Sequence, residues 1–292
     1  MEAPRPPGPF ASPAELAPPV IDPVSGGTRY AEIEYARVWG YRPLRMDLVL
    51  PRGAGPVPVV LWVHGGMWLF GSRRDGPRAS SVCRALLERG VAVAQVEYRF
   101  SGEILFPGCL HDVKAAVRWL RRFGPQLGVD GEVIGIWGES SGGHVAALVA
   151  MNAAEVDSTV GVPDGSSTVG AAVAWCPVTD ILALGPDGAG SDDPSSPEAL
   201  LIGGPTGQLS EAATAASPIS YVSAEAAPLL LVHGLDDQLV PPQQSVLLHE
   251  ALRRVGAVSE LDQVESAGHV LYGVDVDPIA DRSADFLVRH LH

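Results

Sequence analysis

Apolar positions along the chain fall into two kinds of short segment. Polar and apolar residues roughly alternate over 29–38 and 44–50, as in strands with one face in water. Other runs are mostly apolar, as in strands buried on both faces. These runs cover residues 57–63, 91–96, 133–137, 171–175 and 228–232. We expect the alternating segments to be antiparallel edge strands, and the apolar runs to form the centre of a sheet.

Helical spacing is found between these runs. The clearest case is an apolar stripe whose members are three or four residues apart, which predicts one face of a helix: Leu110, Val113, Val117 and Leu120. A second helix is expected over residues 145–151. Strands that alternate with helices predict an α/β fold with a mostly parallel sheet, of about eight strands, and helices on both faces.

The chain of 292 residues suits a single α/β domain, which we place at residues 28–292. Residues 1–27 are rich in Pro and Gly and predict an N-terminal arm. Residues 179–227 form a long connection in which a short helix is expected near 198–201. Because connections of that length in compact domains are usually functional, we expect this insertion to wall one side of a site.

Composition excludes several classes of function. The formal charge of -14 would repel a phosphate backbone, so neither nucleic acid nor an anionic membrane is expected as a partner. No apolar run approaches the roughly 18 residues of a membrane span, and prolines interrupt the N-terminus where a secretory signal would need an apolar core. Three separated cysteines predict neither a disulfide framework nor a metal site: Cys83, Cys109 and Cys176. We expect a cytoplasmic monomer or homodimer.

The segment GESSGGH at residues 138–144 lies between an apolar run and a predicted helix. A serine framed as GxSxG between a strand and a helix is typical of a nucleophile elbow, a tight turn that exposes the hydroxyl. Gly138 and Gly142 fit such a turn because a Cβ there would collide with neighbouring backbone. Ser140 is therefore the predicted nucleophile.

A serine hydroxyl needs a base to accept its proton, and a third group that holds the base in the right tautomer. Asp236 and Asp237 follow a buried run, where catalytic groups of α/β sheets gather. His269 follows a later strand-like run and completes the chain order Ser, Asp, His. Asp180, also just past a buried run, is an alternative acid.

The segment HGGMW at residues 64–68 ends another apolar run. Acyl transfer needs backbone N–H groups directed at the oxygen that gains charge, and consecutive glycines allow that approach. We expect Gly66, Met67 and Ser141 to supply these amides. Trp68 is a candidate for the substrate pocket, although an aromatic residue beside a glycine loop often only holds the loop in place.

Three further histidines and one acid lie close to these motifs. His64 and His233 end buried runs, where a histidine more often fixes loop backbone than takes part in catalysis. His144 lies in the first turn of the helix after Ser140. It is placed to contact the HGGMW loop, but a packing role is the stronger expectation. Glu139, beside Ser140, has two interpretations: a carboxylate that pairs with a nearby base, or one that anchors a neighbouring loop. The structural role is the stronger expectation.

Together these motifs resemble the bacterial α/β-hydrolase esterases related to hormone-sensitive lipase and to feruloyl-esterase-like carboxylesterases. The resemblance spans residues 30–290 and rests on HGGMW (64–68), YR (98–99), FP (106–107), DVKAAVRWLR (112–121), GESSGGH (138–144), SPISYV (217–222), HGLDDQLVP (233–241) and AGH (267–269). In that family the acid is the fifth residue of HGxxDxxVP, which implies Asp237 rather than Asp236. The resemblance also implies the α/β-hydrolase fold.

The leading hypothesis is a serine carboxylesterase that acts on small to medium carboxylic esters through an acyl-enzyme on Ser140, without cofactor or metal. The chain departs from the HGGG of many relatives at Met67, whose side chain would narrow the acyl pocket. Because HGGxW also resembles the kynurenine formamidases, an aryl-formamide or other amide hydrolase is the first alternative. A non-catalytic ligand-binding protein of the same fold is the second.

Overall fold

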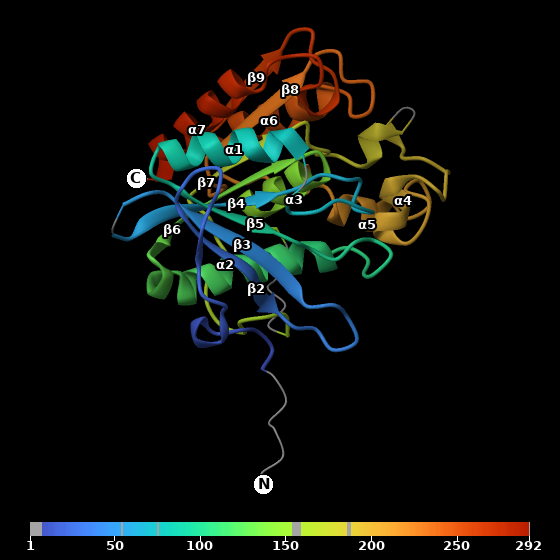
Figure 1. Ribbon diagram of the computed structural model, residues 1–292. Helices are drawn as coiled ribbons and strands as arrows, with labels where there is room; N and C mark the ends of the chain where they lie inside the picture. The colour runs from blue at the N-terminus through green and yellow to red at the C-terminus, as the bar shows by residue number, and fades with distance from the viewer. Residues whose placement is uncertain (1–7, 54, 75, 154–158, 186–187, 292) are drawn as a thin grey trace.

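A nine-stranded sheet in the order β1-β2-β3-β5-β4-β6-β7-β8-β9 forms the centre of the protein (Figure 1). The computed structural model describes residues 8–53, 55–74, 76–153, 159–185 and 188–291. The strands are β1 (Val20–Ile21), β2 (Thr28–Ala36), β3 (Leu44–Leu50), β4 (Val57–Val63), β5 (Ala92–Val96), β6 (Val129–Glu139), β7 (Ala171–Trp175), β8 (Leu229–Gly234) and β9 (Ser259–Val264). β1, β2, β3 and β5 pair antiparallel in turn, and every pair from β5 through β4 to β9 is parallel.

The α/β fold with a mostly parallel sheet is confirmed, as is the division between alternating and apolar segments. The alternating segments form β2 and β3 toward one edge, and the apolar runs form the parallel centre. One strand exceeds the predicted number, because Val20–Ile21 within the predicted arm pairs with β2. The predicted arm also contacts α2 (Gly108–Phe123), because the Trp119 Nε1–H donates a hydrogen bond to the Ala11 carbonyl at 2.8 Å.

Helices cover both faces of the sheet. They are α1 (Gly76–Glu88), α2 (Gly108–Phe123), α3 (Ser141–Ala150), α4 (Pro197–Ile202), α5 (Ser210–Ala215), α6 (Gln243–Val255) and α7 (Asp277–Leu291), with short 3-10 turns at Pro13–Glu15, Gly124–Leu127, Leu182–Leu184, Pro218–Tyr221 and His269–Leu271. Within the described residues, no helix has the length and apolar character needed to cross a bilayer.

The two faces bury separate hydrophobic clusters because side chains of a strand alternate between them. On one face, α1 and α7 lie side by side in front of the sheet and cover Val60, Trp62 and Trp137 (Figure 1). On the other face, α2, α3 and α6 cover residues such as Val59 and Leu61. The strands between are buried on both sides, which explains their nearly continuous apolar runs.

The insertion over residues 179–227 holds α4 and α5, which lie beyond one end of the central strands (Figure 1). α4 ends at Gly203 in the left-handed conformation, and its N-terminus is capped by the Ser196 hydroxyl, which accepts from the Ala199 amide. Hydrogen bonds therefore close both ends of α4.

A buried ion pair joins the loop after β5 to the first turns of α2. The Asp112 carboxylate accepts from the Arg99 backbone amide at 2.8 Å and from the Arg99 guanidinium at 2.7 Å. Asp112 is fully buried and Arg99 is 5% exposed. Removing one member of such a pair leaves the other charge buried without compensation.

We expect Asp112→Ala to lower the free energy of unfolding by about 3–5 kcal/mol, because the Arg99 guanidinium and amide would lose their acceptor. Urea unfolding followed by far-UV circular dichroism measures this loss. Glu260→Ala is the control, since its pair with Arg289 is largely exposed and should contribute under about 1 kcal/mol. Equal losses in the two variants would contradict a special role for the buried pair.

Candidate active site

Ser140 occupies the turn between β6 and α3 with φ 52° and ψ -122°, a conformation that a residue with a side chain rarely adopts. The turn is held where the Ser140 amide donates to the Trp175 carbonyl at 2.7 Å. A Cβ at Gly138 would lie 2.1 Å from the Gly142 carbonyl oxygen, and one at Gly142 would lie 2.1 Å from that of Val63. Only glycine fits these two positions, so the strained turn is enforced by its neighbours.

The structure brings His269 and Asp237 to this turn from the far end of the chain. The Ser140 Oγ is 2.9 Å from His269 Nε2, and His269 Nδ1 is 2.8 Å from Asp237 Oδ2. With Nδ1–H donating to the carboxylate, Nε2 is free to accept the serine proton. This is the relay that a serine nucleophile requires.

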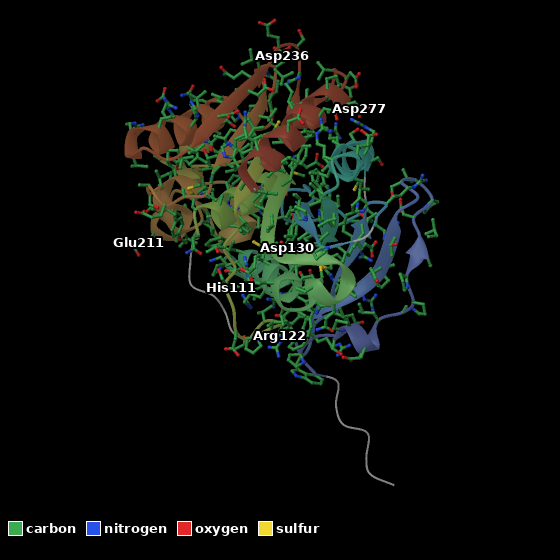
Figure 2. All side chains as sticks on the ribbon, turned by 90° about the vertical axis from the view of Figure 1, so that its left-hand side faces the viewer. His111, Arg122, Asp130, Glu211, Asp236 and Asp277 are labelled. Carbon is green, nitrogen blue, oxygen red and sulfur yellow. The ribbon has the colours of Figure 1, made fainter. Side chains whose placement is uncertain are left out.

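The two neighbouring acids, Asp236 and Asp237, differ in their exposure to solvent. Asp237 is 4% exposed, and its Oδ1 accepts from the amides of Leu239 and Val240, both at 2.9 Å. Asp236 is exposed, and Figure 2 places it at the outer edge of the molecule. Asp180 instead accepts from the amides of Leu182 and Ala183 in its own loop. Of the three candidate acids, Asp237 is the one in contact with His269.

The surroundings of Asp237 keep its carboxylate charged. Burial by itself raises the pKa of Asp237, but hydrogen bonds from His233 and His269 and from the Val240 amide outweigh it, so the pKa lies below its ordinary value. His233 Nε2 is 3.3 Å from Asp237 Oδ2 and 2.9 Å from the Val240 carbonyl oxygen. His233, expected to be structural, thus holds the loop that carries the acid.

The HGGMW loop leaves β4 with three successive residues at positive φ: Gly66 at 125°, Met67 at 56° and Trp68 at 58°. In the described part of the chain, the amides of Gly66 and Met67 donate no backbone hydrogen bond outside regular elements. Ser141 opens α3, so its amide has no intrahelical acceptor. Among the described residues, these three amides therefore have no hydrogen-bond acceptor, and they lie beside the Ser140 turn.

His144 links this loop to the helix of the nucleophile and to the insertion. The Trp68 Nε1–H donates to His144 Nδ1 at 3.1 Å, and His144 Nε2–H donates to the Ala216 carbonyl at 2.7 Å. Both rings are buried, and burial lowers the pKa of His144 to about 4. Sequence reasoning gave His144 a structural role and considered a contact with the HGGMW loop, which agrees with the hydrogen bond from Trp68, but it did not predict the link to Ala216. The sequence signals for this connection were the presence of a histidine in GESSGGH and of a tryptophan in HGGMW.

A cavity of about 410 Å³ opens beside Ser140. Its walls include Met67, Trp68, Ser140 and Ser141 together with residues of the insertion, such as Ile181 and Glu198. Trp68 is only 2% exposed and contributes little of its surface to the cavity. A larger cavity of about 630 Å³ lies against α1 and holds none of the predicted site residues. We place the candidate site in the smaller cavity because it contains the serine.

The remaining predicted groups have structural contacts. His64 stacks on Tyr98 with ring centroids 4.8 Å apart, and its Nδ1 lies 2.7 Å from the Gly65 carbonyl oxygen. Ligand atoms of Cys176, His233 and Asp237 lie within 4.8 Å of one another, a spacing that can hold a metal ion. His233 and Asp237 are already committed to hydrogen bonds with Val240 and His269, so the cluster serves the acid loop.

Comparison with known proteins gives one consistent result. The family model described as BD-FAE matches residues 46–252. The probable carboxylic ester hydrolase LipM of Mycobacterium tuberculosis is 29% identical over 77% of this chain and 50% of its own length. Esterase LipC of the same organism is 30% identical over 93% of this chain and 69% of its own. This chain therefore spans half of LipM and about two thirds of LipC.

A solved structure shares the fold over nearly its whole length. The truncated form of a carbohydrate esterase from gut microbiota superposes with a TM-score of 0.80 at 27% identity, covering 92% of this chain and 98% of that one. The common sheet and helices thus extend well beyond the short motifs around the serine.

We expect Gly142→Ala to disrupt the site, because the added Cβ would meet the backbone oxygens of Val63 and His64 at 2.1 and 2.5 Å. Overpacking of this kind costs about 1–3 kcal/mol or more, measurable by urea unfolding. The matched control is Gly102→Ala, where nothing lies within 4 Å of the new Cβ. The clash account fails if both substitutions leave the unfolding midpoint unchanged.

His144 should make stability depend on pH. Its pKa is about 4 in the folded protein against 6.5 ordinarily, so below pH 6.5 only the unfolded chain takes up the proton. The contribution of neutral His144 to the free energy of unfolding is fully present above pH 6.5. It decreases by about 3 kcal/mol as the pH falls to 4. In urea titrations at pH 7 and 4.5, His144→Gln should show a smaller decline than the wild type. Identical declines would contradict this assignment.

Proposed function

The chain belongs to the BD-FAE family of α/β-hydrolases, and on that premise we propose that it is a serine carboxylesterase acting on small to medium carboxylic esters. The observation that carries the proposal is the continuous contact from Ser140 Oγ through the His269 ring to the buried Asp237 carboxylate, at 2.9 and 2.8 Å. The ester hydrolases among its relatives support the bond type, and the cavity of about 410 Å³ supports the substrate size.

The chemistry follows from these contacts. His269 Nε2 accepts the hydroxyl proton as Ser140 Oγ attacks the ester carbonyl carbon, and Asp237 stabilises the resulting imidazolium through Nδ1–H. The amides of Gly66, Met67 and Ser141 donate to the carbonyl oxygen as it becomes negative, each contributing about 2.7–4 kcal/mol. The C–O bond to the alcohol then breaks and His269 protonates the leaving alcohol. His269 then accepts a proton from water as the water attacks the acyl-enzyme carbonyl carbon. The acid is released, and His269 returns the proton to Ser140 Oγ.

Location and assembly belong to the same proposal. The three cysteines are free, with Cys109 and Cys176 buried, and burial raises the pKa of both thiols to about 12. Unreactive, unpaired cysteines support a reducing compartment, so we propose a cytoplasmic enzyme that acts as a monomer or homodimer on a small-molecule ester.

We expect Ser140→Ala to reduce kcat on 4-nitrophenyl butyrate by about 10⁴-fold or more and to abolish labelling by a fluorophosphonate, because the nucleophile is removed. Ser141→Ala is the matched control. Its backbone amide remains, so both labelling and most of the activity should persist.

The same assay decides between the candidate functions. Labelling that is absent from the wild type, or equal in Ser140→Ala, would favour a ligand-binding protein. Hydrolysis of N-formylkynurenine without hydrolysis of 4-nitrophenyl acetate or butyrate would replace the esterase by a formamide hydrolase.

A further inference from the structure

Glu198 is one of the residues that line the cavity beside Ser140. It lies in the first turn of α4, whose start is fixed by the Ser196 cap at 3.1 Å from the Ala199 amide. Ala199, Leu201 and Ile202 are buried and anchor the helix to the domain. The partly buried side chain of Glu198 is therefore held at the cavity by a fixed helix.

This carboxyl group has no compensating cation in the described part of the chain. Burial is the main influence on Glu198 and raises its pKa, with only its own amide and the Ser196 hydroxyl opposing that effect. A carboxylate removed from water without an ionic partner gains from any donor that a ligand brings. Unlike Asp237, whose oxygens are already committed, Glu198 retains acceptor capacity.

The rest of the cavity indicates what that ligand carries. The Thr206 hydroxyl is held in the insertion, where it accepts from the Ser191 amide at 2.7 Å. The lining also includes the apolar residues Val178, Ile181 and Leu184. The Trp68 ring is 2% exposed and is turned edge-on to His144, so it offers no open aromatic face for an ammonium group. The cavity suits a compact group with an apolar side and a hydroxyl side.

We propose that Glu198 determines specificity by accepting a hydrogen bond from a hydroxyl group of the ester, in whichever half of the substrate fills the cavity beside α4. This inference rests on the proposed esterase function and names the substrate class for that same site. An ester without a hydroxyl leaves the partly desolvated carboxylate with only its own amide and the Ser196 hydroxyl as donors, and sites built to bind a substrate hydroxyl reject analogues lacking it. A substrate bearing a carboxylate is repelled by the like charge.

The experiment compares kcat/KM for matched esters in the wild type, Glu198→Leu and Glu198→Gln. One series varies the alcohol of an acetate: butyl acetate, glyceryl monoacetate, acetylcholine and acetoxyacetate. A second varies the acyl group, with 4-nitrophenyl butyrate against 4-nitrophenyl 3-hydroxybutyrate. The series that responds identifies the half of the ester beside α4.

In the responding series, the wild type should prefer the hydroxylated ester over its apolar match. Glu198→Leu should reduce that ratio about tenfold or more, the usual effect of a hydrogen bond to a charged group. Glu198→Gln, which still accepts a hydrogen bond, should keep most of the ratio. Both variants should speed hydrolysis of acetoxyacetate if the alcohol lies beside α4.

Glu211→Gln is the control for net charge, since Glu211 is an exposed residue of α5 in the same insertion (Figure 2). It should leave every ratio unchanged. Fluorophosphonate labelling at the wild-type rate shows that each variant is folded with an intact nucleophile.

Ratios that stay equal in the wild type and Glu198→Leu would overturn the role of Glu198. A preference for acetylcholine over glyceryl monoacetate that Glu198→Leu removes would overturn the hydroxyl assignment in favour of a cation. In both cases labelling and hydrolysis persist and the esterase stands. If the wild type neither labels nor hydrolyses any ester, the proposed function itself fails.

Discussion

The close backbone approach between the end of β4 and the turn after β6 is the constraint on which the site depends. Because β4 and β6 are neighbours in the sheet, the HGGMW loop and the Ser140 turn leave the same edge side by side. Gly142 lies against the Val63 carbonyl, and a Cβ on Gly65 would lie 3.2 Å from that of Ser140. Glycines make that approach possible, and it brings the unused amides beside the serine hydroxyl.

The proposed acid and base arrive by a different route. β8 and β9 pair next to each other at the opposite side of the sheet from β1, and the loops that follow them carry Asp237 and His269. A Cβ on Gly234 would lie 2.2 Å from the Ala267 carbonyl, so these loops also depend on a glycine contact. The candidate site thus combines two tight backbone contacts, one beside Ser140 and one between the loops that carry Asp237 and His269.

The parts that sequence predicted are those with a short-range signature. The alternation in 44–50 and the apolar run 57–63 gave β3 and β4 with their observed bounds, and GxSxG identified the Ser140 turn. β1 escaped because two residues amid prolines carry no periodic signal. Glu198 escaped because Gly, Asp, Pro and Ser dominate the preceding segment, so nothing local indicates which side chain faces a cavity formed by distant loops. His144 accepts a hydrogen bond from Trp68, 76 residues away, so no local pattern predicts its full set of contacts.

The hydrogen bond from His144 to the Ala216 carbonyl bears on how such proteins can be re-engineered. The insertion shapes the cavity but supplies none of Ser140, His269 and Asp237. We therefore expect that another loop can replace it on one condition. Whatever replaces residues 179–227 must present a backbone acceptor where Ala216 stands, or His144 loses the partner that fixes its tautomer. Trp68 would then lose its acceptor, and the loop that carries the unused amides would lose its support.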